Sequence, residues 1–277
     1  MIKSEKRLLQ FLSTTSGQVK KLVTDIDSEY RHKTVDKTKY GVPQRDKNGK
    51  IRKRELDITH SELKRIQEQI NFLLQKIPSP DYSFGSVKGR NNILNAYQHF
   101  SNKYFLTIDF KNFFRNINNR QVYSMLISEN FSPDVARTLT RLVTYKGFLP
   151  QGPPSSPIVA NMVFNRTGRI LAKLALEHHL TFTAYMDDLV FSSKVDFKDL
   201  IPIILKTIRD AEFRPHPKKI SYSKSCPEVT GVRLTEHGLY PPASLRTKAF
   251  THFPLRHYVN SFRPFRNMTK YQATPVT

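Results

Sequence analysis

The sequence has almost no cysteine, no tryptophan and no long apolar run. Cys226 is the only cysteine in 277 residues, which excludes an intrachain disulfide framework and any cysteine-rich zinc site. We expect this thiol to pack in the interior of a protein that works in a reducing compartment. No run of about 18 apolar residues occurs, and Met1–Arg7 is too polar for a signal peptide. These absences predict a soluble, cytoplasmic protein with no membrane partner.

Acidic residues are scarce relative to basic ones. Lys and Arg total 45 against 23 Asp and Glu, so the formal net charge is +22. This balance predicts a polyanionic partner held through its phosphates, although charge alone does not distinguish DNA, RNA and a membrane surface. The excess is steepest from Arg214 to the C-terminus, with eleven basic and two acidic residues. A cationic tail of this kind can grip a nucleic-acid duplex without reading its sequence.

The first strong structural pattern is an amphipathic helix that follows a basic turn. Its apolar residues recur at helical spacing: Leu63, Ile66, Ile70, Leu73, Leu74 and Ile77. Thr59-His60-Ser61-Glu62 has the spacing of a capping box at its start. Residues 47–57 predict a basic hairpin that turns at Asn48-Gly49, and Pro78, Pro80 and Gly85 predict a loop after the helix.

The central part of the sequence predicts an α+β fold. A strand over 104–110 ends near Asp109, and helices are expected over 117–130, 158–179 and 197–208, with a Gly/Pro-rich loop at 147–157. Two β-prone runs, 181–186 and 189–192, are separated only by Asp187-Asp188, which predicts a tight hairpin with two carboxylates at its tip. The order of elements favours helices packed against one face of an antiparallel sheet.

Three carboxylates are the strongest candidates for chemistry. Asp187 and Asp188 cannot both be ionised at low cost unless a cation compensates them, and Asp109 ends a second apolar strand. If the three converge, they form the ligand set expected for two Mg²⁺ ions at a phosphoryl-transfer centre. The alternative is that Asp-Asp is simply a good turn former and that Asp109 caps the next helix.

Three segments resemble reverse transcriptases and occur in the order of that family: 106–114 (LTIDFKNFF), 149–157 (LPQGPPSSP) and 185–188 (YMDD). Two further segments resemble the retron branch. Asn95-Ala96-Tyr97-Gln98-His99 is similar to its Asn-Ala-x-x-His element, and Val229-Thr230-Gly231 is similar to its Val-Thr-Gly triplet. The resemblance covers roughly residues 47–231 and implies that these two elements, with Asn95, His99, Val229, Thr230 and Gly231, bind RNA.

The resemblance implies a right-hand polymerase architecture. Residues 1–100 would form N-terminal helices and fingers, 101–232 a palm with an antiparallel sheet, and 233–277 a short basic thumb. About 46 residues follow Gly231, which is short for the thumb of retron enzymes, so we expect a compact thumb or RNA or a partner that takes over part of its work. Pro153-Pro154 also replaces the small residues common in this loop.

The resemblance also implies roles for individual residues. Asp109, Asp187 and Asp188 would hold two Mg²⁺ ions, and Phe114 would close against a ribose 2′-hydroxyl and select dNTPs. The alternative for Phe114 is a core position. Gln151 and Gly152 would line the nucleotide pocket, where glycine permits a close backbone approach. Ser156 is equally expected to cap the following helix, with Pro157 in its first turn.

Basic side chains complete the predicted site. Arg54, with Lys53 and Lys50 nearby, would hold the incoming triphosphate, because a forked guanidinium suits phosphate oxygens. The alternative is a solvated basic hairpin. Lys219 occupies the place of a late lysine proposed to protonate the leaving pyrophosphate, although Lys218 could serve instead and His216 stands where the family usually has Asn.

The function implied by the resemblance is RNA-directed DNA synthesis. A retron enzyme copies part of a cognate structured non-coding RNA, starts from an internal RNA 2′-hydroxyl, yields an RNA–DNA product and acts in antiphage defence with an accessory effector protein. Two alternatives are a reverse transcriptase of another defence lineage or of intron origin, and a non-catalytic RNA-binding module on a polymerase fold. The sequence does not decide the oligomeric state.

Overall fold

The computed structural model describes residues 1–39, 42–225, 228–251 and 253–266. The predicted packing of Cys226 therefore lies outside the described residues. The chain divides into two compact units: unit 1 comprises 1–78 and 112–164, and unit 2 comprises 79–111 and 165–277. Each unit is built from two separate stretches of chain. The division into fingers (1–100), palm (101–232) and thumb (233–277) stays a prediction. Across the described residues, none of the helices has the length and apolar character needed to span a membrane.

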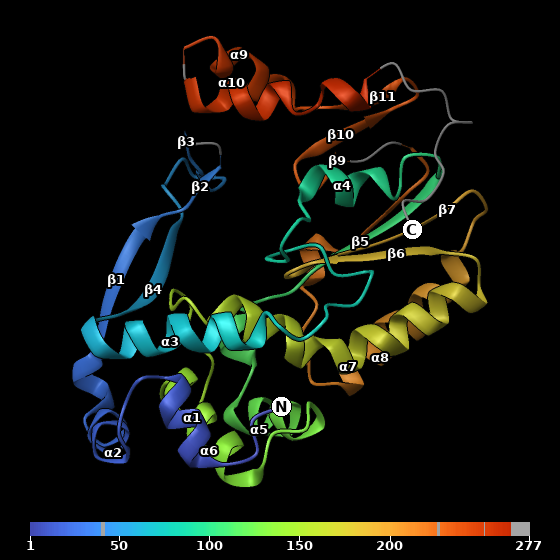
Figure 1. Cartoon of the computed structure of the whole chain (residues 1–277). Coiled ribbons are helices and arrows are strands. Elements are labelled where there is room, and N and C mark those ends of the chain that lie inside the picture. Colours follow the sequence, from blue (N-terminus) through green and yellow to red (C-terminus); the bar gives the residue numbers. More distant parts are fainter. Residues whose placement is uncertain (40–41, 226–227, 252, 267–277) are drawn as a thin grey trace. The chain divides into compact units, whose positions relative to one another are not determined.

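Unit 1 is mainly helical and carries a long two-stranded hairpin (Figure 1). Its helices are α1 (Glu5–Phe11), α2 (Ser16–Thr24), η1 (Ile26–Glu29), α3 (Ser61–Leu74), η2 (Phe114–Asn116), α5 (Asn119–Ser128) and α6 (Pro133–Val143). Its strands are β1 (Tyr30–Asp36), β2 (Thr38–Lys39), β3 (Val42–Pro43) and β4 (Lys53–Thr59). The helices α1, α2 and α6 and the strand β1 were not expected from the sequence as separate elements, whereas α3 and α5 were.

Helix α3 forms because one face carries a continuous apolar stripe. Leu63, Ile66 and Ile70 are fully buried, as their helical spacing predicts. The predicted capping box is wrong, since the N-cap is His60 and its side chain makes no capping hydrogen bond. Thr59 instead donates from Oγ1 to Gln67 Oε1 at 3.0 Å. Burial of the stripe, and not a cap, therefore secures the start of this helix.

The basic hairpin predicted over 47–57 is partly correct. A turn does form at Asn48-Gly49, where Gly49 has φ +79° and donates to Asp46 O at 3.0 Å. However, β4 pairs with β1, with Tyr30 opposite Thr59 and Asp36 opposite Lys53. The true partner strand lies further back in the sequence because long-range pairing overrides the local turn signal.

Unit 2 contains a four-stranded antiparallel sheet in the order β6-β7-β5-β8. Its strands are β5 (Tyr104–Asp109), β6 (Thr181–Tyr185), β7 (Asp188–Ser193) and β8 (Ser221–Ser223), and a smaller sheet joins β9 (Glu228–Val229), β10 (Val232–Thr235) and β11 (Gly238–Tyr240). The helices are α4 (Asn92–Tyr97), η3 (Lys198–Leu200), α8 (Ile201–Asp210), η4 (Pro217–Lys219), α9 (Ala243–Ala249), α10 (Phe253–Asn260) and η5 (Arg263–Phe265). Helix α7 (Ser156–Glu177) runs from unit 1 into unit 2.

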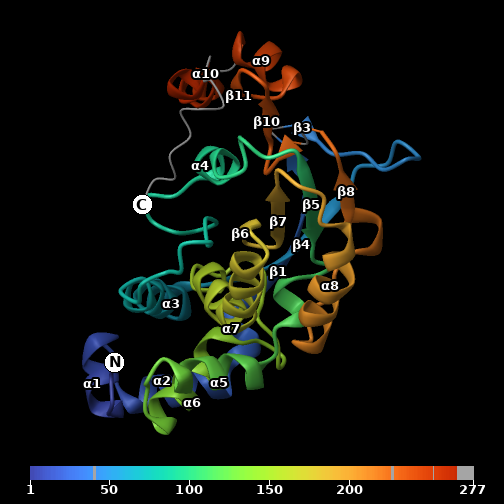
Figure 2. The same cartoon turned by 90° about the vertical axis from the view of Figure 1, so that its right-hand side faces the viewer.

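These strands and helices confirm the predicted α+β class and the antiparallel sheet. The strand over 104–110, the hairpin over 181–192 and the helices near 158–179 and 197–208 are all present, with bounds shifted by a few residues. Figure 2 shows α4 beside β10 and β11, and Figure 1 shows the same neighbours. One hydrophobic cluster of unit 2 joins Ala96 and Phe100 to Val232, Leu239 and Phe262.

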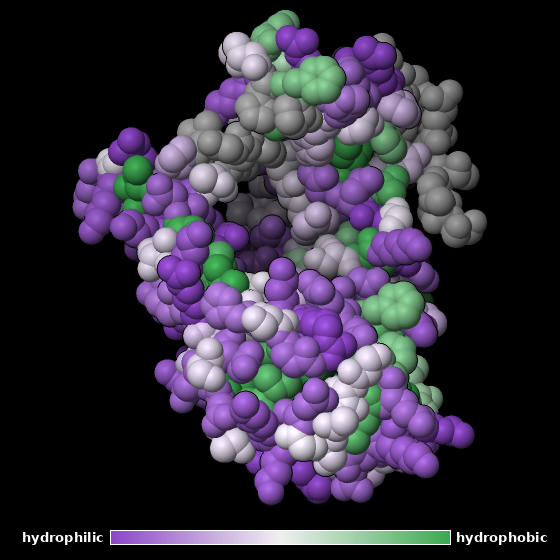
Figure 3. Space-filling model, turned by 60° about the vertical axis from the view of Figure 1, so that its left-hand side comes forward, coloured by the Kyte–Doolittle hydropathy of each residue, from purple (hydrophilic) through white to green (hydrophobic). Residues whose placement is uncertain are grey.

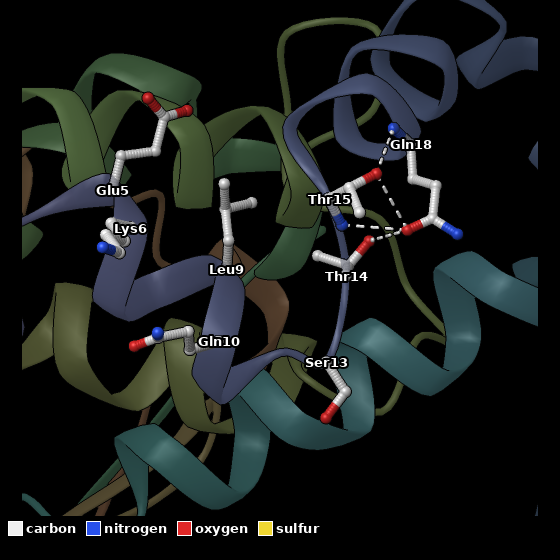
Figure 4. A pocket seen from close by; sticks show the side chains of 8 residues that line it. All are labelled: Glu5, Lys6, Leu9, Gln10, Ser13, Thr14, Thr15 and Gln18. Carbon is white, nitrogen blue, oxygen red and sulfur yellow. Dashed lines mark hydrogen bonds between the residues drawn. The ribbon is translucent and has the colours of Figure 1, made fainter.

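The surface is largely hydrophilic on the face shown in Figure 3, with hydrophobic residues in small groups. A shallow hollow of about 670 Å³ lies between α1 and α2 (Figure 4). Eight residues line it: Glu5, Lys6, Leu9, Gln10, Ser13, Thr14, Thr15 and Gln18. None of the predicted site residues is among them, so this hollow is not a candidate active site.

Gln67 is a buried polar hub of unit 1, and its removal tests the core. Its Nε2 donates to Tyr30 OH at 3.2 Å and to Leu142 O at 2.8 Å, while its Oε1 accepts from Thr59. We expect Gln67→Ala to lower the free energy of unfolding by about 2–4 kcal/mol, because three buried groups lose a partner and a cavity remains. Urea unfolding measures this. Exposed Gln75→Ala is the matched control and should change stability by less than about 0.5 kcal/mol.

Candidate active site

Strand pairing within unit 2 brings two carboxylates together. Strand β5 ends at Asp109 and β7 begins at Asp188, and the antiparallel register places these two residues directly opposite each other. Opposed residues in an antiparallel pair have side chains on the same face of the sheet. Apolar residues on both strands, including Leu106, Ile108 and Leu189, are fully buried and fix this register. Asp109 and Asp188 therefore share one end of the sheet, and the condition on which the predicted site depended, that the Asp109 strand lies beside the hairpin, is met.

The third carboxylate lies in the turn between β6 and β7. Tyr185 pairs with Asp188, so the two turn residues are Met186 and Asp187. The prediction of both carboxylates at the tip needs correction, because Asp188 already belongs to the strand. Met186 takes φ +57°, which the turn requires and which side chains seldom adopt. The Asp187 carbonyl accepts from Phe110 N–H at 3.1 Å, which holds the turn against the end of β5.

The electrostatics show a concentration of negative charge. Burial, followed by the charges of Asp187 and Asp109, raises the pKa of Asp188 to about 7. Burial together with the Asp188 charge also raises the pKa of Tyr185. A cation placed among these groups would stabilise the ionised form of Asp188 and reverse its shift. The donor set is therefore chemically suited to a divalent metal, whose preferred ligands are carboxylate oxygens.

Lys219 lies beside this carboxylate set. Its Nζ donates to Asp109 Oδ2 at 2.6 Å, and its charge lowers the pKa of Asp188 against the larger raising effects. Lys218, the alternative from the sequence, is exposed. The segment is held in place by His216, whose backbone N–H donates to Asp109 O at 2.8 Å. Of the two lysines, Lys219 is the one that contacts a carboxylate.

The side chains do not form a ready-made metal centre. Among the described residues, no group of three or more His, Cys, Asp or Glu side chains is arranged to hold a metal ion. One oxygen of Asp109 is already paired with the Lys219 ammonium. The assignment of Asp109, Asp187 and Asp188 as metal ligands thus stays a prediction, supported by their pairing and charge.

Gly85 is a site residue that the sequence marks only as part of a loop. A Cβ at this position would lie 2.6 Å from Met186 N and 3.0 Å from Tyr185 C. The preceding residues bond to β6, since Phe84 N–H donates to Ala184 O at 2.8 Å. Gly85 thus lets the loop pass directly against the backbone of the carboxylate hairpin. The sequence around Gly85 carries no helix or strand pattern. It therefore did not predict this contact with the hairpin.

The two motifs assigned to RNA binding meet in unit 2. Asn95 Nδ2 donates to Thr230 Oγ1 at 3.2 Å, although the two residues are far apart in the sequence. Thr230 takes φ +46°, and Val229 is fully buried. The two elements therefore pack against each other around α4. Asn95 itself is also fully buried, so its side chain has no exposed surface for RNA here.

His99 is fully buried as well, and both of its ring nitrogens are hydrogen-bonded. Nδ1 lies 2.6 Å from Ser192 Oγ on β7, and Nε2 lies 2.8 Å from Thr183 Oγ1 on β6. This residue ties the end of α4 to the carboxylate hairpin. A direct contact between the His99 side chain and RNA stays a prediction. In this conformation the side chain has no exposed surface that RNA could touch.

In unit 1 the Gln-Gly loop packs on β4. Asp57 N–H donates to Gln151 O at 2.8 Å. A Cβ on Gly152, where φ is +130°, would lie 3.0 Å from Asp57 O, so only glycine fits without strain. The predicted cap by Ser156 is wrong, because α7 begins at this residue and its buried Oγ has no hydrogen-bond partner among the described residues.

The remaining predicted residues also lie in unit 1. Phe114 opens the short helix η2 and is partly buried, which suits either a gate or a core position. Lys53 and Arg54 are neighbours on β4 and are both exposed. Because successive strand residues point to opposite faces, these two cations cannot serve one phosphate group together from the same face. Arg54 shares its face with Leu56, and Lys53 shares the other with Glu55 and Asp57.

The chain matches the family described as reverse transcriptase (RNA-dependent DNA polymerase) over residues 42–234. It is 30% identical over 174 residues to Retron Ec86 reverse transcriptase of Escherichia coli, covering 62% of this chain and 52% of the relative. It is 35% identical over 136 residues to Retron Se72 reverse transcriptase of Salmonella heidelberg, covering 48% and 36%. It is 28% identical over 237 residues to Retron Mx65 reverse transcriptase of Myxococcus xanthus, covering 77% of this chain and 55% of the relative. The chain thus spans about half the length, or less, of these relatives.

A solved structure supports the fold. The chain is similar to telomerase from Candida albicans, solved with a fragment of telomeric RNA, with a TM-score of 0.53 over 81% of this chain and 50% of that chain. The identity is 10%, so this likeness concerns the fold alone.

A methyl group at Gly85 tests the packing of the carboxylate hairpin. We expect Gly85→Ala to lower the free energy of unfolding by about 1–3 kcal/mol, because the new Cβ would overlap backbone atoms of the hairpin. The control is Gly17→Ala, whose Cβ would meet nothing within 4 Å and whose helical site favours alanine by up to about 1 kcal/mol. Urea unfolding measures the free energy of unfolding of both variants. Equal stability of Gly85→Ala and Gly17→Ala would contradict this packing.

The buried His99 predicts a pH dependence of stability. Burial lowers the pKa of His99 to about 3, whereas an unfolded histidine titrates near about 6.5. Below that pH the unfolded chain binds a proton that the folded chain does not. His99 should therefore make the free energy of unfolding fall as the pH drops from about 6.5 toward 3, by up to about 1.4 kcal/mol per unit, with no such loss above about pH 7.

The matched experiment compares His99→Gln with the exposed His178→Gln by urea unfolding at pH 7.5, 6.5 and 5.5. We expect His99→Gln to be less stable at neutral pH, because Ser192 and Thr183 lose a partner, but to have a flatter dependence on pH than the parent protein. His178→Gln should keep the parent slope. Parallel slopes for all three proteins would rule out the buried neutral imidazole.

Proposed function

Because the chain belongs to the reverse transcriptase (RNA-dependent DNA polymerase) family, we propose that it catalyses RNA-directed DNA synthesis from dNTPs. The observation that carries this proposal is the register of β5 and β7, which sets Asp109 opposite Asp188 beside the turn that holds Asp187. Carboxylates crowded in this way are costly without cations. Their presence at one end of a sheet fits a site for charged substrates and metal ions.

The three carboxylates would hold two Mg²⁺ ions. When bound, such ions supply charge stabilisation for the attacking hydroxyl, the transferred phosphoryl group and the pyrophosphate leaving group. Among the protein's own groups, Lys219 supplies a positive charge beside Asp109 and would give a proton to the leaving pyrophosphate from Nζ. Gly85 and His99 would keep the hairpin in place by packing and hydrogen bonding.

The groups of unit 1 would bind and select the nucleotide. Arg54 would hold the triphosphate through its guanidinium fork, with Lys53 adding positive charge from the other face of the strand. Phe114 would close against the sugar and exclude a 2′-hydroxyl. Gln151 and Gly152 would line the base pocket, where the glycine backbone allows a close approach.

The RNA partner would be a cognate structured non-coding RNA of a retron. The support is similarity to relatives named as retron reverse transcriptases and the presence of the Asn95–His99 and Val229–Gly231 elements in the sequence. Synthesis would start from an RNA 2′-hydroxyl and yield an RNA–DNA product that stays bound to the enzyme. The enzyme would have a fingers and palm architecture and would work in the cytoplasm. An accessory effector and a role in antiphage defence would follow from membership of a retron.

The alternative is a non-catalytic RNA-binding module on the same fold. It predicts the loss of at least one metal-binding carboxylate, whereas Asp109, Asp187 and Asp188 are all present. A reverse transcriptase of another defence lineage or of intron origin would share the active site but not the Asn95–His99 and Val229–Gly231 elements.

Primer extension tests the proposed function. Purified protein is given an RNA template, an annealed DNA primer, labelled dNTPs and Mg²⁺, and is compared with Asp187→Ala/Asp188→Ala. We expect the double variant to lose extension by at least about 1,000-fold, because it removes two of three charged groups at the reacting phosphate. Asp196→Ala, an exposed carboxylate beyond the end of β7, should keep full activity.

RNA binding separates the alternatives. The double variant should still bind the template with an affinity within about threefold of the parent, since basic residues elsewhere supply the phosphate contacts. If the parent protein itself fails to extend a primer, even with RNA co-purified from its host, but binds RNA equally well without Mg²⁺, the non-catalytic module is the correct assignment.

A further inference from the structure

Asp57 lies at the centre of a junction in unit 1 that nothing in the predicted chemistry requires. We define this Asp57 junction as Asp57, His32, Arg115 and the backbone of Gln151 and Gly152. The Asp57 carboxylate contacts His32 Nδ1 at 3.1 Å through Oδ1 and Arg115 Nη2 at 3.7 Å through Oδ2. The backbone of Asp57 binds the Gln151–Gly152 loop at the same point of β4.

Burial distinguishes Asp57 from the other charged residues of the hairpin. Its side chain is 11% exposed, whereas those of His32, Arg115 and Glu55 are 53%, 50% and 58% exposed. A carboxylate at this depth loses much of its hydration and needs its ionic partners. Arg115 also reaches Glu55 Oε2 at 3.4 Å. One guanidinium therefore binds both Glu55 and Asp57, which are two positions apart on the same face of β4.

Arg115 connects this junction to Phe114. The two residues are adjacent in η2 (Phe114–Asn116), so the ionic contacts of Arg115 hold the short helix that presents Phe114. A second tie runs through the backbone, because Leu149 N–H donates to Ile117 O at 2.8 Å. The helix η2 and the Gln151–Gly152 loop are therefore both fixed to β4, and Asp57 is the residue that contacts both.

We propose that Asp57 is a positioning residue that sets the selectivity for deoxynucleotides, by holding the Phe114 turn and the Gln151–Gly152 loop in one arrangement on β4. This inference rests on the proposed function, in which Phe114 and Gln151 contact the incoming nucleotide. Asp57 itself touches no substrate. Its carboxylate holds the Phe114 turn through Arg115, and its backbone binds the Gln151–Gly152 loop. Loss of the carboxylate therefore loosens the Phe114 turn against that loop, which weakens nucleotide binding and relaxes the rejection of the ribose 2′-hydroxyl.

Single-nucleotide primer extension with dNTP and with the matching rNTP tests this assignment. We expect Asp57→Asn to raise KM for dNTP by about 5–10-fold with kcat within about twofold, because ground-state positioning is lost. The preference for dNTP over rNTP in kcat/KM should fall by about tenfold, the effect of one lost charge-assisted contact. Arg115→Gln should show the same changes, and Arg115→Lys should restore part of the selectivity.

The matched control is Asp134→Asn, another carboxylate of unit 1, which pairs with Arg137 at 3.0 Å and is 73% exposed. It should leave KM and selectivity unchanged. Template affinity and urea unfolding are measured for each variant. A purely structural role for Asp57 predicts lower stability and an equal loss with both nucleotides, and that result would overturn the proposal.

The outcomes also separate this proposal from the proposed function. If the parent protein extends primers and Asp57→Asn keeps its KM and its selectivity, the positioning role is wrong and the polymerase assignment stands. If Asp57→Asn does not fold, Arg115→Gln decides by the same two measurements. Absence of extension by the parent protein would refute the proposed function, and the positioning role with it.

Discussion

The antiparallel pairing of β5 with β7 is the constraint on which the candidate active site depends. Both strands are largely apolar, and their burial selects a register that places Asp109 opposite Asp188. The hydrophobic effect thus brings two carboxylates to one end of the sheet. Burial, followed by the charges of Asp187 and Asp109, raises the pKa of Asp188 to about 7. A slip of one strand by one residue would put the two carboxylates on opposite faces of the sheet and expose the apolar residues of the shifted strand.

The surroundings of the hairpin in unit 2 act mainly to preserve this register. His99 bridges hydroxyl groups on β6 and β7, and the loop around Gly85 lies against the turn at Met186. Asn95 and Thr230 join α4 to the loop between β9 and β10. The Asn95–His99 and Val229–Gly231 elements, which the resemblance associates with RNA, therefore stabilise the fold. Side chains of both elements are buried and hydrogen-bonded within the protein.

Unit 1 presents the groups expected to contact a nucleotide, and β4 organises them. One edge of this strand pairs with β1, and the backbone of Asp57 binds the loop that contains Gln151. The strand alternation then separates Arg54 from Lys53, so a single basic run in the sequence becomes two different surfaces. In both units, backbone hydrogen bonds of one strand determine which side chains lie close enough to act together. In unit 2 that strand is β5, paired with β7, and in unit 1 it is β4.

The sequence by itself determined the α+β class, the helix after Ser61, the strand that ends at Asp109 and the carboxylate hairpin, because each depends on local periodicity or turn chemistry. It also determined the candidate carboxylates, since the motifs around them are contiguous. Only the tertiary structure decided that β4 pairs with β1, that Lys219 and not Lys218 contacts Asp109, and that His99 is buried. These depend on contacts between distant segments, which no local pattern encodes. The same reason explains why Gly85 and Asp57 gave no sequence signal: each acts through the backbone or side chain of a residue far away in the chain.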